Sequence, residues 1–356
     1  MSQVILTPEN GYIKLAQYIH EKMSHKILLV CGRSFLKTRA YQWLKDYTDK
    51  NEVKLTRFSD FHPNPDHRSV VQGVEAACRE ACDSIIAAGG GSAIDVAKCI
   101  RHDTGIEHLL AIPTTAGSGS EATHFAVVYH QGVKKSVDCG IPDAVLLDSS
   151  TLDSLPDYQR KATMLDALCH GIESFWSGSA THESMLHSEY AIRSIMADWQ
   201  AYLHNRPAGN AGMLRAAHRA GQAINLAQTT AGHAMSYQIT KRYGIAHGHA
   251  AALCVAKLWP YMLDHMDQCV DARGLSHLEI VLSAIAKAMG GQSAEDGPEQ
   301  FQSILKGLDL EAPVCTREEL PALAAGVDPI RLKNFPISLT VKDIEGLYRQ
   351  ILEERG

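Results

Sequence analysis

Short apolar runs and amphipathic stretches alternate over the first 150 residues of the chain. Four of the runs are typical of buried strands: KILLVCG (26–32), DSIIAAGGG (83–91), HLLAIPTT (108–115) and AVLLDSS (144–150). Each run ends in glycine, proline, threonine or serine, and helical patterns lie between several of them. Strands that alternate with helices predict a parallel sheet covered by helices.

The pattern changes after Leu155 and Pro156. From about residue 157 to 290 the apolar residues recur at helical spacing, without a strand pattern. Short helical segments follow, and Thr340 and Asp343 have the spacing of a capping box that opens a final helix. We therefore predict an α/β domain over residues 1–155 and an all-helical domain over residues 156–356.

Composition and charge exclude several classes of protein. Hydrophobic residues make up 45% and charged residues 21% of the 356 residues, which is typical of a globular protein. The net charge of −6 leaves no basic excess to bind nucleic acid. No apolar run approaches the roughly 20 residues that span a bilayer, and the N-terminal residues do not resemble a signal peptide. We expect a cytoplasmic protein whose nine cysteines are reduced, and which binds neither nucleic acid nor membranes.

Two polar loops suit the binding of a phosphate group. Gly89-Gly90-Gly91-Ser92 follows a predicted strand and opens a helix, whose free N–H groups attract anions. Ser92 and Asp95 have the spacing of an N-cap and its N3 residue. The alternative is a tight turn without a ligand, since the run is not the G-x-G-x-x-G fingerprint. A second loop, Thr114 to Glu121, follows the next predicted strand, so both loops can line one crevice at the strand ends.

Four further residues have the chemistry of a metal site. Asp166 and His170 are four residues apart, which places both on one face of a helix. A helix end and a turn between His233 and His247 would bring these histidines to the first pair. Three imidazoles and one carboxylate suit Fe²⁺ or Zn²⁺. Taken alone, however, an Asp-x-x-x-His pair is more often an ordinary surface pair.

Four motifs together resemble the iron-containing alcohol dehydrogenase family. They are, in chain order, GGGSAIDVAK, IPTTAGSGSEAT, DALCHGIESFWS and GHAMSYQITKRYGIAHGHA. The resemblance covers essentially the whole chain, including Asn64-Pro65 and NFPISLTVKDI (334–344). It implies a nucleotide-binding α/β domain and a helical metal-binding domain, the dehydroquinate synthase-like fold. It also implies hydride transfer between a nicotinamide cofactor and an alcohol/aldehyde pair.

The resemblance also implies roles for individual residues. The metal ligands would be Asp166, His170, His233 and His247. The cofactor contacts would be Asn64, Gly89, Gly90, Gly91, Ser92, Asp95, Lys98, Thr114, Thr115 and Ser118. Fe²⁺ is expected as the metal, with Zn²⁺ as the alternative. Relatives commonly form homodimers or larger assemblies, and we expect the same here.

Two positions depart from the family pattern. Many members have a histidine four residues after the third metal ligand, where this chain has Tyr237. Tyr237 becomes a catalytic candidate beside His247, because a phenol can donate a hydrogen bond to the forming alkoxide; the alternative is that it only packs. Gly32 replaces an acid that often binds the ribose 2′-hydroxyl, and Arg33 can pair with a 2′-phosphate. This favours NADPH, or the use of both NADPH and NADH, unless Arg33 is simply solvated.

Within the family, the segments ESFWS and AGHAMSYQITKRYGIAHGHA resemble phosphonoacetaldehyde reductases. This implies reduction of phosphonoacetaldehyde to 2-hydroxyethylphosphonate in phosphonate biosynthesis. Lys241, Arg242 and His249 are candidates to bind the phosphonate, although each could instead face solvent. The alternatives are a general short-chain alcohol or aldehyde dehydrogenase, a lyase of the dehydroquinate synthase kind, and a metal-binding protein without catalytic activity.

Overall fold

The computed structural model describes residues 3–23 and 25–354, which divide into two compact units. The first unit contains the residues up to Pro156 together with Gln200–Gly221. The second contains Asp157–Trp199 and the residues from Gln222 onward. The first division lies beside the predicted join at residues 155 and 156, whereas Gln200–Gly221 clusters with the first unit. The division into two separate domains, over residues 1–155 and 156–356, therefore stays a proposal.

A six-stranded parallel sheet forms the centre of the first unit, with the strand order β1-β8-β5-β4-β2-β3. The strands are β1 (Val4–Leu6), β2 (Lys26–Cys31), β3 (Lys54–Phe58), β4 (Ser84–Gly89), β5 (His108–Pro113) and β8 (Ala144–Leu146). The four predicted strands, β2, β4, β5 and β8, are confirmed. The apolar pattern does not reveal β1, which has only three residues, or β3, whose sequence KLTRF mixes polar and apolar residues. It also misses a hairpin of β6 (Phe125–His130) and β7 (Val133–Asp138).

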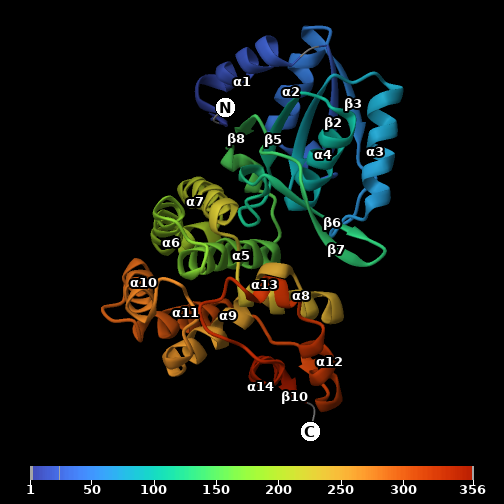
Figure 1. Ribbon diagram of the computed structural model, residues 1–356. Coiled ribbons are helices and arrows are strands. Elements are labelled where there is room, and N and C mark those ends of the chain that lie inside the picture. The colour runs from blue at the N-terminus through green and yellow to red at the C-terminus, as the bar shows by residue number, and fades with distance from the viewer. Residues whose placement is uncertain (1–2, 24, 355–356) are drawn as a thin grey trace. The chain divides into compact units, whose positions relative to one another are not determined.

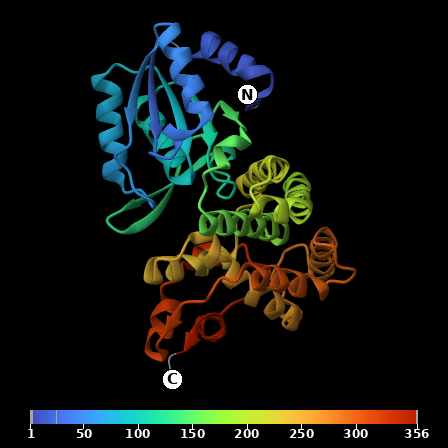
Figure 2. The same cartoon turned by 180° about the vertical axis from the view of Figure 1, so that it is seen from behind.

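Helices cover both faces of the sheet (Figures 1 and 2). Along β2, Ile27 and Leu29 belong to the same core as residues of α1 and α2. The alternate residues Leu28 and Val30 belong to the core of α3 and α4. These helices are α1 (Glu9–Lys22), α2 (Arg39–Lys50), α3 (His67–Arg79) and α4 (Gly91–Thr104). Because both faces are buried, the central strands read as continuous apolar runs.

The strand order reverses between β2 and β4, because β3 lies on the other side of β2. Doubly wound sheets bind ligands at the carboxyl ends of the strands where such a reversal occurs. Gly32 and Arg33 follow β2, and Gly89 is the last residue of β4. The Thr114 N–H donates to the carbonyl of Gly89 at 2.9 Å. The two polar loops therefore follow neighbouring strands, as predicted.

The described chain after Asp157 is mainly helical. The helices are α5 (Asp157–Trp176), α6 (His182–Leu203), α7 (Pro207–Ala227), α8 (Ala231–Tyr243), α9 (His247–Asp264), α10 (Leu275–Ala288), α11 (Asp296–Leu308), α12 (Leu320–Ala325), α13 (Pro329–Leu332) and α14 (Val341–Ile351). Two strands of two residues each, β9 (Val314–Cys315) and β10 (Glu353–Glu354), pair with each other in parallel. The predicted capping box at Thr340 and Asp343 is confirmed at the start of α14.

Short 3₁₀ helices occur in both units: η1 (Phe35–Lys37), η2 (Ser120–Ala122), η3 (Ser149–Leu152), η4 (Met266–Gln268) and η5 (Arg317–Glu319). In the second unit α9 packs against both α5 and α8, and these three helices carry the predicted metal ligands. None of the helices in the described part of the chain has both the length and the apolar character needed to cross a membrane.

Candidate metal and nucleotide sites

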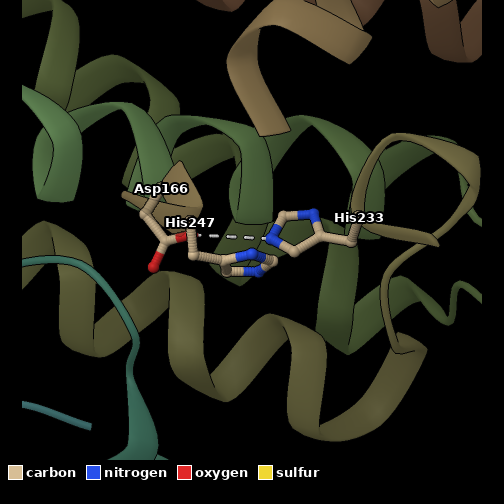
Figure 3. A group of neighbouring side chains, drawn as sticks. All are labelled: Asp166, His233 and His247. Carbon is tan, nitrogen blue, oxygen red and sulfur yellow. Dashed lines mark ion pairs between the residues drawn. The ribbon is translucent and has the colours of Figure 1, made fainter. Parts of the chain in front are cut away.

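Three side chains from three helices of the second unit point toward one another (Figure 3). Asp166 comes from α5, His233 from α8 and His247 from α9, and one possible ligand atom of each lies within 4.8 Å of the others. Asp166 Oδ1 lies 3.6 Å from His233 Nε2. Both atoms are buried, and among the described residues neither has a hydrogen-bond partner. Buried polar atoms are rarely left unpaired, so this donor set fits a divalent metal ion.

His170 lies one turn after Asp166 on α5, as the sequence spacing predicts. Its Nε2 is 4.0 Å from Asp166 Oδ1, and its ring stacks on that of His233 with a centroid separation of 4.5 Å. His170 is not part of the tighter group of three. Its role as a fourth ligand stays a prediction.

A close approach of two helices positions His247. The next residue, Gly248, lies in the first turn of α9 against α5. A Cβ atom at Gly248 would overlap the carbonyl oxygen of Ala162 and lie 2.8 Å from the backbone nitrogen of Asp166. Only glycine permits this approach. The start of α9 can therefore place His247 beside Asp166.

Glu173 supports the cluster from behind, a role that the sequence analysis did not identify. Its fully buried carboxylate accepts hydrogen bonds from the Nδ1 of His233 and from the hydroxyl and backbone N–H of Thr230, the latter two at 2.6 and 3.1 Å. Because Nδ1 is occupied in this way, Nε2 of His233 is directed at the cluster. Such carboxylate–histidine pairs orient metal ligands in many sites. The available signal was a glutamate three residues after His170 in an otherwise mainly apolar stretch.

Neighbouring charges shift the pKa values of Asp166 and His233. Burial raises the pKa of Asp166, but the neighbouring His170, His233 and His247 outweigh this and hold that pKa well below its usual range. Burial lowers the pKa of His233, but Glu173 and Asp166 outweigh it and raise the pKa to about 10. The two carboxylates thus favour the charged form of the His233 imidazole.

Tyr237 lies directly beside the cluster. Its ring stacks on that of His247, with a centroid separation of 5.0 Å and an interplanar angle of 9°. The Tyr237 ring is thus next to one of the metal-ligand candidates. Its part in proton transfer stays a prediction.

The three residues expected to bind a phosphonate have different surroundings. Lys241 is exposed, and Arg242 forms an ion pair with Glu319. His249 is only 3% exposed, and its Nδ1 lies 3.2 Å from the hydroxyl of Tyr158. These contacts give Arg242 and His249 partners within the protein, and binding of substrate by any of the three stays a prediction.

The glycine-rich turn opens α4, but not at the residue that we predicted. The N-cap of α4 is Gly90 and the helix begins at Gly91, so the prediction of Ser92 as N-cap is wrong. The extended backbone of Gly90 lets the helix begin before Ser92, which lies in its first turn. Because Gly90 has no side chain to cap the helix, the N–H groups of that turn fit an anion such as a diphosphate.

The second loop lies against this turn. A Cβ atom at Gly91 would be 2.9 Å from the Ser118 hydroxyl, and one at Gly90 would be 3.1 Å from the Thr115 hydroxyl. Thr114 is 7% exposed at the start of the same loop. The glycines thus let the two loops form one polar surface beside the start of α4. Contact of Thr114, Thr115 and Ser118 with a nucleotide stays a prediction.

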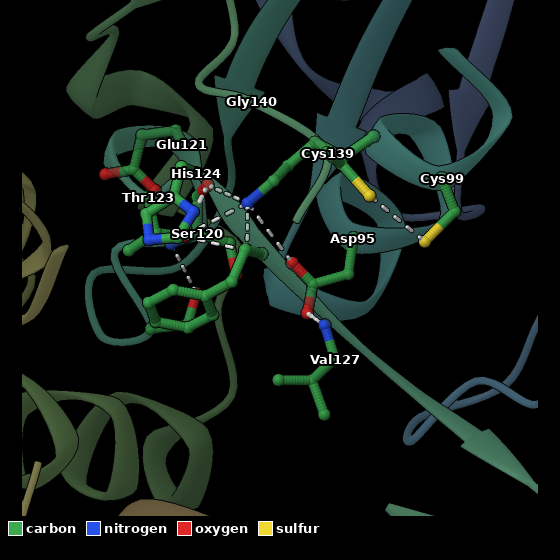
Figure 4. A network of polar contacts seen from close by, with 12 residues as sticks. Asp95, Cys99, Ser120, Glu121, Thr123, His124, Val127, Cys139 and Gly140 are labelled. Atoms are coloured by element: carbon green, nitrogen blue, oxygen red, sulfur yellow. Dashed lines mark hydrogen bonds and ion pairs between the residues drawn. The ribbon is translucent and has the colours of Figure 1, made fainter. Parts of the chain in front are cut away.

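Asp95 and Lys98, both on α4, hold the second loop and β6 in place. Figure 4 shows Asp95 beside Val127, and Ser120 and Thr123 in the same network. The ammonium group of Lys98 is fully buried and donates to Ser120 O at 3.1 Å, to Thr123 Oγ1 at 3.0 Å and to the carbonyl of Phe125. Asp95 Oδ2 accepts from the backbone N–H of Val127 at 3.0 Å, while its Oδ1 lies 3.8 Å from Lys98. These bonds give both residues an internal role, and their predicted contact with cofactor stays a prediction.

The remaining cofactor candidates lie on exposed loops of the first unit. Gly32 and Arg33 follow β2 directly, and Arg33 is exposed. Asn64 is exposed between β3 and α3 and has a positive φ of 57°. Their contacts with a nucleotide stay predictions.

The second loop also has a buried anchor on α7 that the sequence did not reveal. Glu121 Oε1 lies 3.4 Å from Nδ1 of His218, and both side chains are almost fully buried. Gly119 lies so close to Gly221 of the same helix that a Cβ atom on either residue would overlap the other. The loop is therefore fixed on two sides, by α4 and by α7.

Comparison with known families agrees with the fold and the motifs. The family model described as iron-containing alcohol dehydrogenase matches residues 4–149. The model for the C-terminal part of the Fe-containing alcohol dehydrogenase family matches residues 161–352. Together the two matches cover nearly the whole chain.

The sequences of individual relatives match a smaller part of the chain than the two family models do. Phosphonoacetaldehyde reductase of Streptomyces viridochromogenes is 35% identical over 225 residues, which span 61% of this chain and 53% of that protein. Alcohol dehydrogenase 4 of Schizosaccharomyces pombe is 29% identical over 252 residues, which span 64% of this chain and 60% of that protein. Less than two thirds of each relative's own length is therefore matched. The crystal structure of an iron-containing alcohol dehydrogenase from Thermotoga maritima has a TM-score of 0.84 and 24% identity, and the match covers 99% of this chain and 98% of that one.

Proposed function

Because this chain belongs to the iron-containing alcohol dehydrogenase family, we propose that it uses a nicotinamide nucleotide and a divalent metal to reduce an aldehyde to a primary alcohol. The observation that carries the proposal is the group of Asp166, His233 and His247, in which Asp166 Oδ1 and His233 Nε2 are buried without a hydrogen-bond partner in the part of the chain that the structure describes. We propose His170 as the fourth ligand, and Fe²⁺ ahead of Zn²⁺, because both ions accept these donors and the family is named for iron. A metal ion bound there supplies a Lewis acid that polarises the aldehyde carbonyl, while the reduced nicotinamide supplies the hydride.

The chain's own residues would orient the reactants and control protons. Glu173 holds His233 in the tautomer that presents Nε2, and Gly248 lets His247 reach Asp166. We propose that Tyr237, which stacks on His247, donates a hydrogen bond to the forming alkoxide. The first turn of α4 and the hydroxyls of Thr115 and Ser118 would bind the diphosphate of the nucleotide.

We propose NADPH as the preferred nucleotide, because Gly32 has no acidic side chain and the next residue, Arg33, is an exposed cation after β2. Replacing Arg33 with glutamate is expected to lower the ratio of kcat/KM for NADPH to that for NADH by about 10- to 100-fold, the effect of losing a charge-assisted contact with the 2′-phosphate. Steady-state kinetics with both nucleotides measure this ratio. Lys50→Glu, an exposed charge reversal at the end of α2, is the control and should leave the ratio unchanged. The same ratio in Arg33→Glu and the wild type would contradict the nucleotide assignment.

For the substrate, we propose phosphonoacetaldehyde, which the chain would convert into 2-hydroxyethylphosphonate. Support comes from the 35% identity to a phosphonoacetaldehyde reductase and from Lys241 and Arg242 in the last turn of α8, the helix that carries His233. The test is NADPH oxidation by the purified chain with phosphonoacetaldehyde and with the neutral aldehyde in which a tert-butyl group replaces the phosphonate. We expect kcat/KM to be at least about tenfold higher for the phosphonate, since a buried or half-buried charge contact contributes that much. Equal or better use of the neutral aldehyde would instead indicate a general aldehyde reductase.

A further inference from the structure

Arg331 lies close to the metal cluster, although no sequence motif identifies it. It belongs to α13, which packs against α8 within the second unit. Its guanidinium carbon lies 5.2 Å from the centroid of the Tyr237 ring, which in turn stacks on His247 at 5.0 Å. The guanidinium is therefore within about 10 Å of the His247 ring, and the Tyr237 ring contacts both groups.

The surroundings of Arg331 leave it accessible to a ligand. The side chain is 29% exposed, and Asp328, at 3.7 Å from its Nε, is itself 49% exposed. An exposed ion pair of this kind is weak, and a guanidinium has five N–H donors with which it can bind an oxyanion in addition. By comparison, Arg242 forms a closer ion pair with Glu319, and the side chain of His249 is buried against Tyr158.

We propose that Arg331, held over the ring of Tyr237, binds the anionic tail of the aldehyde and thereby sets the preference of the site for substrates that end in a tetrahedral oxyanion. The inference rests on the proposed function, because it concerns the choice among aldehydes at the same cluster. In phosphonoacetaldehyde the carbonyl oxygen and a tail oxygen are about 5 Å apart. With a polar contact of about 3 Å at each end, such a molecule can span the roughly 10 Å between the His247 ring and the guanidinium. A planar fork of donors is also well suited to phosphonate or sulfonate oxygens.

The test compares Arg331→Met with Arg193→Ala. Methionine keeps an unbranched apolar stem that can still pack over Tyr237, but it removes the charge. We expect Arg331→Met to raise the KM for phosphonoacetaldehyde by about 10- to 100-fold, with kcat changed less than about threefold and the neutral tert-butyl aldehyde used as before. Arg331→Lys, which keeps the charge without the fork, should recover part of the affinity. Arg193→Ala, which removes an exposed arginine paired with Glu189 on α6, should behave like the wild type with both aldehydes.

Binding gives a readout that does not depend on turnover. Calorimetric titration with 2-hydroxyethylphosphonate should show the same 10- to 100-fold loss of affinity in Arg331→Met, at unchanged metal content. Wild-type affinity for this phosphonate in Arg331→Met, or an equal loss for charged and neutral aldehydes, would overturn the role of Arg331. A wild-type protein that does not prefer phosphonoacetaldehyde would instead overturn the proposed substrate, so the two failures can be told apart. Repeating the kinetics with sulfoacetaldehyde in place of phosphonoacetaldehyde shows whether the site selects a phosphonate tail or any tetrahedral oxyanion.

Discussion

Replacing His247 with alanine is expected to lower turnover by about a thousandfold and to remove most of the bound metal. The imidazole is one of three ligand candidates within 4.8 Å of one another, and the first turn of α9 is held against α5 to place it there. Losing a ligand removes the polarisation of the carbonyl, which contributes several kcal/mol to the stabilisation of the transition state. The measurements are kcat with the preferred aldehyde and metal content by elemental analysis of the purified variant.

A matched control lies at the other end of the same helix. His265 is the residue directly after the C-terminal end of α9, whereas His247 is the first residue of that helix. The Nδ1 of His265 lies 2.8 Å from the carbonyl of Tyr261. His265→Ala should keep both metal and turnover close to wild-type values. If His247→Ala retained full metal content and full rate, His247 would not be a ligand.

The second large effect is expected for Glu173→Gln, which should weaken metal binding by about 10- to 100-fold. The substitution keeps the size of the side chain but replaces a carboxylate that accepts from Nδ1 of His233 and twice from Thr230. A neutral amide makes the imidazole a poorer donor toward the metal and no longer fixes its tautomer. Competition with a metal-binding dye measures the change in affinity directly.

Stability and a control substitution separate this effect from misfolding. Losing one buried hydrogen bond at Thr230 should lower the free energy of unfolding by about 1 to 3 kcal/mol, which urea titration of the metal-free protein measures. Glu189→Gln on α6 removes an ion pair with Arg193 on a partly exposed surface and should leave metal affinity unchanged. Equal metal affinity in Glu173→Gln and the wild type would show that Glu173 is structural only.

The fold could be predicted where burial dominates the sequence. β2, β4 and β5 are covered on both faces, so each reads as a continuous apolar run. β1 and β3 lie at the two edges of the sheet, where fewer positions are buried, and their sequences have no such run. The helix start at Gly91 was misplaced because a serine with an acid three residues later matches an N-cap, whereas the backbone of Gly90 decides where α4 begins.

The candidate site was only partly visible in the sequence. The helical spacing of Asp166 and His170 predicts that they lie on one face of a helix. Adding His233 and His247 to the same site needed the family motifs, because the spacing of residues within one helix does not predict contacts between helices. Glu173 and Arg331 were missed for the same reason. Each contacts a residue of another helix: Glu173 contacts His233, and Arg331 contacts Tyr237.

The central claim is that the cluster around Asp166, His233 and His247 holds a divalent metal on which aldehyde reduction depends. Its most direct test is the oxidation of NADPH with phosphonoacetaldehyde before and after removal of metal with a chelator, alongside elemental analysis. The account predicts that the stripped chain remains folded and binds the nucleotide but no longer reduces the aldehyde, and that adding Fe²⁺ or Zn²⁺ restores the rate. Reduction at the original rate by a chain shown to hold no metal would contradict the account.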